Sequence, residues 1–234
     1  MVSPLIHPFA CPAGMEVCPV LEEALRLKKE CQRLKELTQT DPLTGSFNRR
    51  QLMASLDREM ERTRRTGLPA CLIMIDLDHF KRLNDTCGHQ FGDAVLRRVA
   101  CLIKDNVRKL DIPCRYGGDE FAVVLPGTRL PQAVRLAERL KAKLAQAWVD
   151  PQGQNGQLTA SFGVDTFTSR EELTPEAFLQ RADHWLFLAK ARGGNSVCHP
   201  ESVQAAGEAG LSRNERRAFL LPDNLSDKVG ESYG

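Results

Sequence analysis

Short apolar runs alternate along this chain with longer amphipathic segments, and this alternation limits the fold more than any other feature. The run 71–75 is continuously apolar, which is typical of a strand buried on both faces. Leu52, Leu56 and Met60 recur at helical spacing after Asn48, a residue type that caps helices well. The other segments follow the same two patterns: strands up to Tyr116 and over 121–125 and 158–164, and helices through 95–103 and over 130–147 and 175–191. Strands that alternate with helices predict an α/β or α+β fold built on one sheet.

Two acidic pairs fall at the ends of predicted strands. Asp76 and Asp78 stand where the first apolar run ends, and Asp119-Glu120 follows the glycines Gly117-Gly118 in a predicted hairpin. Either pair alone is explained as well by a solvated turn. If the hairpin lies beside the first strand, the two pairs converge, and converging carboxylates can hold Mg²⁺ for phosphoryl or nucleotidyl transfer. The two glycines would let a phosphate or a base approach the backbone.

The segment 115–121, Arg-Tyr-Gly-Gly-Asp-Glu-Phe, resembles the signature of the GGDEF family, the diguanylate cyclases that condense two GTP molecules into cyclic di-GMP. Further segments resemble the other motifs of the family in the same order: 41–45, 48–50, 76–81, 84–85, 88–89, 92–93, 160–164 and 189–190. Ordered motifs are far more specific than one short match. The resemblance covers 41–198 and implies a palm-like α+β domain, with a central mixed sheet flanked by helices and the signature on a β-hairpin.

The resemblance also implies two divalent cations, Mg²⁺ or Mn²⁺, in each active site. Their ligands would be the carboxylates of Asp76 and Asp119 and the backbone carbonyl of Leu77. Glu120 takes the second acidic position of the signature, with a role in supporting catalysis. Lys190 matches a lysine that contacts the triphosphate. The implied catalytic residues are therefore Asp119, Glu120 and Lys190.

Guanine recognition is a second role that the resemblance implies. Asn84 and Asp93 match the pair that reads the base, and the chemistry agrees, because a carboxylate accepts from the N1–H and N2 amino edge that adenine does not offer. Lys81 matches a second lysine on the triphosphate, and the Gly117-Gly118 pair belongs to the substrate-binding hairpin. His89 is either a ligand-facing imidazole or a structural histidine, and the sequence favours neither.

An inhibitory site for the product is implied by Arg108 and Asp111, an Arg-x-x-Asp placed just before the signature. Arg139, on the next predicted helix, matches a further arginine of that site. Guanidinium groups suit both guanine edges and phosphates. The alternative is an exposed charged turn without a ligand.

One position departs from the family pattern. Gly194 stands where the family commonly has an arginine that would grip the terminal phosphates. Loss of a bidentate contact of this kind weakens binding by about 1–3 kcal/mol. Arg192 is a candidate substitute from two positions away, and the sequence does not decide whether its side chain reaches.

Three segments lie outside the matched region. Residues 1–19 are rich in proline and are expected to form a flexible leader, and the Gly-, Ser- and Asn-rich residues 199–234 a mobile tail. Apolar residues in steps of four and three predict a helix over 20–40, and favour a short coiled coil that would help two chains dimerise. The alternative is a single amphipathic helix lying on its own domain.

Composition narrows the partners and the compartment. The chain has 32 Lys and Arg against 30 Asp and Glu, a formal charge of +2, which argues against a partner as long and acidic as a nucleic acid. It has neither an apolar run long enough to span a membrane nor a signal peptide, so a cytoplasmic setting with reduced thiols is expected. Cys11 and Cys18 with His7 either bind a metal or sense redox state, or are unremarkable thiols.

The resemblance therefore predicts a diguanylate cyclase that depends on metal, acts as a dimer and is inhibited by its product. The main alternative is a catalytically weak domain that binds cyclic di-GMP or GTP and signals by contact. A nucleotidyltransferase acting on nucleic acid is disfavoured by the balanced charge.

Overall fold

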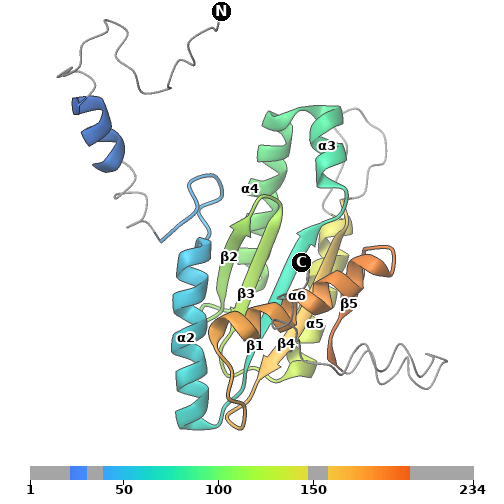
Figure 1. Cartoon of the computed structure of the whole chain (residues 1–234). Helices are drawn as coiled ribbons and strands as arrows, with labels where there is room; N and C mark the ends of the chain where they lie inside the picture. Colours follow the sequence, from blue (N-terminus) through green and yellow to red (C-terminus); the bar gives the residue numbers. More distant parts are fainter. Residues whose placement is uncertain (1–21, 31–38, 147–157, 201–234) are drawn as a thin grey trace, which may run out of the picture.

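A computed structural model describes residues 22–30, 39–146 and 158–200. Its centre is a sheet with the strand order β2-β3-β1-β4-β5 (Figure 1). The strands are β1 (Ala70–Leu77), β2 (Ile112–Gly117), β3 (Glu120–Leu125), β4 (Ala160–Phe167) and β5 (Val197–Cys198). The helices are α2 (Arg49–Thr66), α3 (Phe80–Cys87), α4 (His89–Asn106), α5 (Leu130–Gln146) and α6 (Pro175–Ala191). Residues 22–30 form one more helix, whose residues are exposed.

The sheet is mixed, as the sequence predicted. Strand β1 lies at its centre and is antiparallel to both β3 and β4, whereas β4 and β5 are parallel. The hairpin of β2 and β3 therefore lies beside β1. In that register Asp76, near the end of β1, faces Glu120 at the start of β3.

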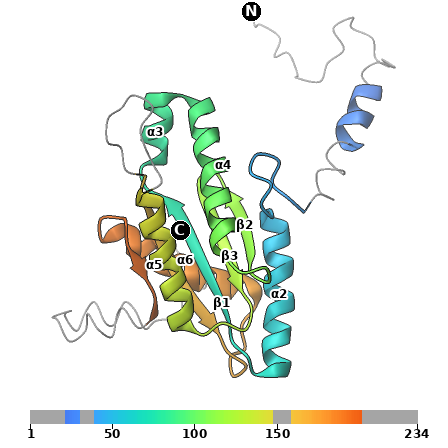
Figure 2. The ribbon, with the colours of Figure 1, turned by 180° about the vertical axis from the view of Figure 1, so that it is seen from behind.

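Helices cover both faces of the sheet. Leu72 and Met74 of β1 point to the side covered by α2 and α6 (Figure 1), whereas Ile73 and Ile75 point to the side covered by α4 and α5, which Figure 2 shows in front. Because helices cover both faces of the sheet, the residues of β1 are buried. Residues 71–75 of the strand accordingly form one continuous apolar run.

Local signals set the ends of two helices. The Asn48 side chain accepts a hydrogen bond of 3.0 Å from the backbone N–H of Gln51, and α2 ends at Gly67, whose φ is 73°. The Thr174 hydroxyl caps α6 in the same way by accepting from the N–H of Ala177, with Pro175 in the first turn.

Helix α6 lies directly against the backbone of β4 at Gly163. A Cβ atom there would come within 2.2 Å of both the Ala182 carbonyl oxygen and the Leu186 backbone nitrogen. The close approach of helix and strand depends on the absence of a side chain at this position.

The structure refines three details of the sequence prediction. The helical region predicted after the first strand is two helices, because the chain breaks at Gly88, whose φ is 85°. Gly117 belongs to β2, so the hairpin turn consists of Gly118 and Asp119. Strand β5 was not predicted, because its two residues are too few to show a period.

Several sequence predictions fall on residues that the structure does not describe. These are the leader 1–19 with His7, Cys11 and Cys18, most of the helix predicted over 20–40, and nearly all of the tail 199–234. Among the described residues, no helix combines the length and apolarity that a membrane crossing requires.

Candidate active site

Acidic side chains meet where β1 ends beside the hairpin. Asp76 is buried and pairs in register with Glu120, and the backbone N–H of Leu77 donates to the Asp119 carbonyl over 3.4 Å. Asp119 and Glu120 are half-buried. The two acidic pairs recognised in the sequence therefore converge, because the hairpin pairs with β1.

Lys190 brings the last turn of α6 to this cluster. Its Nζ atom lies 2.5 Å from Oδ2 of Asp76. The lysine side chain is nearly half exposed, whereas the Asp76 side chain is about one-tenth exposed (44% and 10%). The cationic end of Lys190 therefore remains open to solvent on one side, while it neutralises part of the buried carboxylate.

Burial, with the crowding of like charges added to it, raises the pKa values of two of these acids. Burial raises the pKa of Asp76, and the charges of Asp119 and Asp78 add to this rise, whereas Lys190 opposes it. The pKa of Glu120 is raised by burial first and then by the charges of Asp76 and Asp183. One lysine is not enough to balance the cluster.

The donor set fits a divalent cation that is shared with a phosphorylated ligand. Among the described residues, no group of three or more His, Cys, Asp or Glu side chains is arranged to hold a metal ion by itself. Asp76 and Asp119 offer two carboxylates and Leu77 offers a carbonyl. Mg²⁺ commonly takes one or two carboxylates and fills its other positions with phosphate oxygens and water. A cation would also relieve the repulsion that raises the pKa of Asp76.

A pocket of about 400 Å³ opens next to the acidic cluster. It is bounded by α3, the first turns of α4 and the hairpin turn. The residues that line it are Phe80, Lys81, Asn84, Asp85, His89, Asp93, Leu96, Arg115, Gly118 and Asp119. The predicted substrate residues Lys81, Asn84, His89, Asp93 and Gly118 are thus brought together, whereas Gly117 and Lys190 are not in the lining.

Asn84 lines this pocket, with the oxygen of its side-chain amide beside Gly92 of α4. Its Oδ1 atom is buried and accepts no hydrogen bond from the part of the chain that the structure describes. A buried acceptor without a donor is unfavourable, so the amide would gain a hydrogen bond by turning this oxygen toward an N–H group of a ligand in the pocket. His89 is exposed at the first position of α4, which is a placement open to ligand rather than one within the core.

Arg115 is the first residue of the signature segment 115–121, but no role was predicted for it from the sequence. Its guanidinium donates to the Asp41 carboxylate over 3.1 and 3.2 Å, and to the Gly118 carbonyl over 3.0 and 2.7 Å. It therefore ties the loop that precedes α2 to the hairpin turn. The lining residues Phe80, Asp85 and Leu96 were missed as well, because only the packing of α3 on α4 reveals them.

The three residues of the predicted product site also lie together. Arg108, Asp111 and Arg139 line a separate pocket of about 110 Å³, with Thr128 and Gln132 among its other residues. The Asp111 carboxylate accepts from the backbone N–H of Arg108 over 2.7 Å, and burial raises the pKa of Asp111. The Arg139 guanidinium donates to the backbone carbonyl of Asn106 over 2.9 Å.

Comparison with known proteins decides the family. Residues 38–196 match the sequence model described as diguanylate cyclase, GGDEF domain. The chain belongs to the GGDEF family.

The GGDEF domain has close relatives among curated proteins. It is 43% identical over 173 residues to the response regulator PleD of Caulobacter vibrioides (strain NA1000 / CB15N). The aligned region covers 73% of this chain and 38% of PleD. It is 42% identical over 164 residues to the diguanylate cyclase DgcP of Pseudomonas aeruginosa PAO1. Here the aligned region covers 70% of this chain and 24% of DgcP. The chain therefore spans well under half the length of these curated relatives.

A solved structure shows the same fold. The coiled coil and GGDEF domain of DgcB from Caulobacter crescentus, solved in complex with c-di-GMP, matches with a TM-score of 0.65 and 30% identity. The match covers 77% of this chain and 95% of that one. The palm-like mixed sheet with the signature on a hairpin, predicted from the sequence, is confirmed.

Gly194 lies in the loop after α6, beside the Asp78 carboxylate. Gly194 has a φ of 77°, and a Cβ atom there would lie 3.0–3.1 Å from the Asp78 carboxylate. That carboxylate is held by the Ser161 hydroxyl at 2.7 Å and by the Asn195 backbone N–H at 2.8 Å. Arg192 is exposed at the C-cap of α6.

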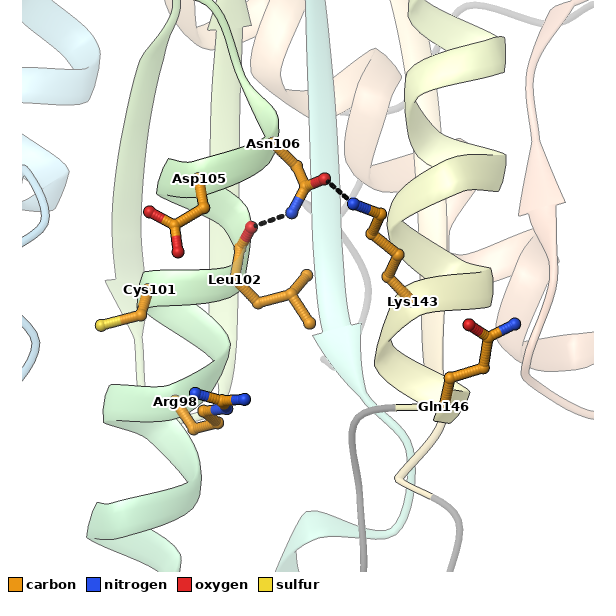
Figure 3. A pocket seen from close by; sticks show the side chains of 7 residues that line it. All are labelled: Arg98, Cys101, Leu102, Asp105, Asn106, Lys143 and Gln146. Carbon is orange, nitrogen blue, oxygen red and sulfur yellow. Dashed lines mark hydrogen bonds between the residues drawn. The ribbon is translucent and has the colours of Figure 1, made fainter.

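A further hollow of the GGDEF domain, about 310 Å³, lies between α4 and α5 and contains none of the predicted site residues (Figure 3). Asn106, the last residue of α4, lines one end of it. Its amide donates to the Leu102 carbonyl over 2.7 Å and accepts from the Lys143 Nζ at 2.5 Å. Because Arg139 donates to the Asn106 backbone, Asn106 also links this hollow to the product pocket.

Proposed function

We propose that this GGDEF domain is a diguanylate cyclase that condenses two GTP molecules into cyclic di-GMP and releases two pyrophosphates. The observation that carries the proposal is the position of the acidic cluster beside a pocket lined by Lys81, Asn84 and Asp93. The pocket has the polarity that a guanine base requires, and the cluster has the charge that a metal-bound triphosphate requires. The name of the relative DgcP, a diguanylate cyclase, supports the same activity.

The base would be read by α3 and α4. The Asp93 carboxylate accepts from the N1–H and N2 amino group of guanine, and the Asn84 amide supplies both an acceptor and a donor. Adenine lacks those donors, so it leaves both side chains without partners, and a site built in this way discriminates strongly.

The triphosphate would lie between the two lysines. Lys81 reaches it from the start of α3 and Lys190 from the end of α6, and Gly118 lets it approach the hairpin backbone. Phosphoryl transfer depends mainly on positioning and charge neutralisation, which these lysines provide.

Asp76, Asp119 and the Leu77 carbonyl would hold Mg²⁺ or Mn²⁺, with Glu120 supporting catalysis. The cations supply Lewis-acid activation of the 3′-hydroxyl and neutralisation of the phosphate charge. The chain's own part is to place the hairpin turn against β1. The 3′-hydroxyl of each GTP would attack the α-phosphate of the other, so that two phosphodiester bonds form, two bonds to pyrophosphate break and each hydroxyl gives up its proton.

Two copies of the domain would have to meet. Each site binds one GTP and supplies half of the reaction, so catalysis requires a dimer, and the helix predicted over 20–40 would hold it together. The pocket at Arg108, Asp111 and Arg139 would bind cyclic di-GMP and keep the two halves apart. We further propose cytoplasmic action on free GTP, without a nucleic-acid partner.

The second candidate is a catalytically weak domain that binds GTP or cyclic di-GMP and signals by contact. Gly194 favours it, because no arginine grips the terminal phosphates there. Incubation of the protein with GTP and Mg²⁺, followed by mass spectrometry, separates the two. Cyclic di-GMP with two pyrophosphates per product establishes the cyclase, whereas GTP binding without turnover establishes the signalling domain.

A further inference from the structure

Gly92 leaves the space that the side chain of Asn84 occupies. Gly92 is buried in the first turns of α4, opposite α3. A Cβ atom built on Gly92 would lie 1.8 Å from Asn84 Oδ1, 2.9 Å from Asn84 Cγ and 3.2 Å from Phe80 Cζ. The backbone of Gly92 has no left-handed conformation that would require glycine, so space alone explains the residue.

The main conflict falls on one movable group, the Asn84 amide, and the Phe80 ring at 3.2 Å must also give by a few tenths of an ångström. Oδ1 is the far end of a rotatable side chain, so an alanine at 92 would displace the Asn84 amide and leave the backbone of both helices in place. Alanine also has a higher helix propensity than glycine. The substitution therefore acts on the orientation of Asn84 rather than on the fold.

We propose that Gly92 is a positioning residue that sets base selectivity by holding open the place of the Asn84 amide. This inference rests on the proposed function, in which Asn84 reads guanine. Gly92 does not itself contact the nucleotide. Its contribution passes entirely through the Asn84 side chain, and it disappears when that side chain is removed.

A four-protein cycle tests the inference. Wild type, Gly92→Ala, Asn84→Ala and the double variant are titrated with GTP and with ATP by calorimetry, which requires no turnover. We expect Gly92→Ala to weaken GTP binding roughly tenfold and to leave ATP binding unchanged. In the Asn84→Ala background, Gly92→Ala should change GTP binding less than twofold, because Oδ1 is gone.

Two further measurements keep the result decisive. Ala94 is exposed on the same helix and lies outside the pocket, so Ala94→Gly changes helix propensity alone and should leave both affinities within twofold. Thermal unfolding reports the fold. If Gly92→Ala were unfolded, the double variant should recover folding, since its Cβ meets only the Phe80 ring.

The outcomes separate the inference from the proposed function. If wild type prefers GTP over ATP and the Gly92→Ala variant does so equally, the inference is overturned and the proposed function is not. If the loss of GTP affinity in the double variant equals the product of the two single losses, the inference is also overturned, because Gly92 would then act independently of Asn84. A wild type that binds GTP no better than ATP overturns the proposed function and this inference with it.

Discussion

The Nη1 atom of Arg115 lies 3.1 Å from Oδ1 of Asp41, and the same guanidinium donates to the Gly118 carbonyl. One half-buried arginine thus joins the loop at the start of the domain to the turn that carries Asp119. Asp41 directly follows the segment predicted as a helix over 20–40. Asp41 and the geometry of the hairpin turn are therefore coupled through the Arg115 side chain.

Asp41→Asn should lower stability by about 1 kcal/mol at neutral pH, because the charged partner of Arg115 is lost. Burial raises the pKa of Asp41, but hydrogen bonds from Thr44 and Arg115 outweigh it, and the pKa of the carboxyl lies below its usual value. A lowered pKa gives stability that is present above the unfolded-state pKa, about 4, and is lost as the pH falls through the folded-state pKa. Urea unfolding at pH 7 and at pH 3 measures the free energy of unfolding on the two sides of this pH range. The difference between wild type and Asp41→Asn should shrink at pH 3, and a constant difference would contradict this assignment.

Asp119→Ala should abolish turnover, on the order of a thousandfold or more, and leave the fold intact. The variant removes one of the few carboxylates available to a divalent cation. Pyrophosphate release with circular dichroism as the folding check measures the effect, and Asp57→Ala, an exposed change on α2, is the control. A folded Asp119→Ala protein with wild-type turnover would exclude the proposed cation site.

Asp93→Ser should lower selectivity for GTP over ATP by about tenfold, because the shorter neutral side chain no longer accepts from the guanine edge. A competition assay with mixed GTP and ATP measures it. Asp105→Ser, at the far end of the same helix, is the matched control. Unchanged exclusion of ATP would mean that another residue reads the base.

Arg108→Ala should raise the inhibition constant for cyclic di-GMP about tenfold and spare the initial rate. The product pocket is separate from the substrate pocket, so only the coupling between the two sites is affected. Progress curves show the effect, with the neighbouring Lys109→Ala as control. If wild type and Arg108→Ala slow down identically as product accumulates, the pocket is not inhibitory.

Gly163→Ala should destabilise the protein by about 1–3 kcal/mol. The atoms that the new Cβ would meet are backbone atoms of Ala182 and Leu186, so no change of rotamer relieves the clash. Chemical denaturation measures the loss. Stability equal to wild type would show that α6 can shift away from β4 at no cost.

The sequence predicted those features that depend on local pattern. The continuous apolar run over 71–75 indicated burial on both faces, whereas the pairing of the hairpin with β1, on which the convergence of the two acidic pairs depends, is shown only by the structure. The contact of Arg115 with Asp41 was not predictable, because it joins segments that are distant in the chain. The space that Gly92 leaves for Asn84 depends on how α3 packs against α4, and no period in the sequence encodes it. The assigned roles of the site residues stay predictions until the variants are measured.

The central position of β1 has a consequence for how the chain is made. Its partners β3 and β4 both come later in the sequence, and Asp76 pairs with Ser161. During synthesis, β1 emerges from the ribosome with two unpaired edges and apolar side chains on both faces. Such a segment is prone to pair with other chains until its own partners arrive. The second edge of β1 stays unpaired until β4 has been translated, so a chain interrupted before residue 160 exposes an aggregation-prone edge.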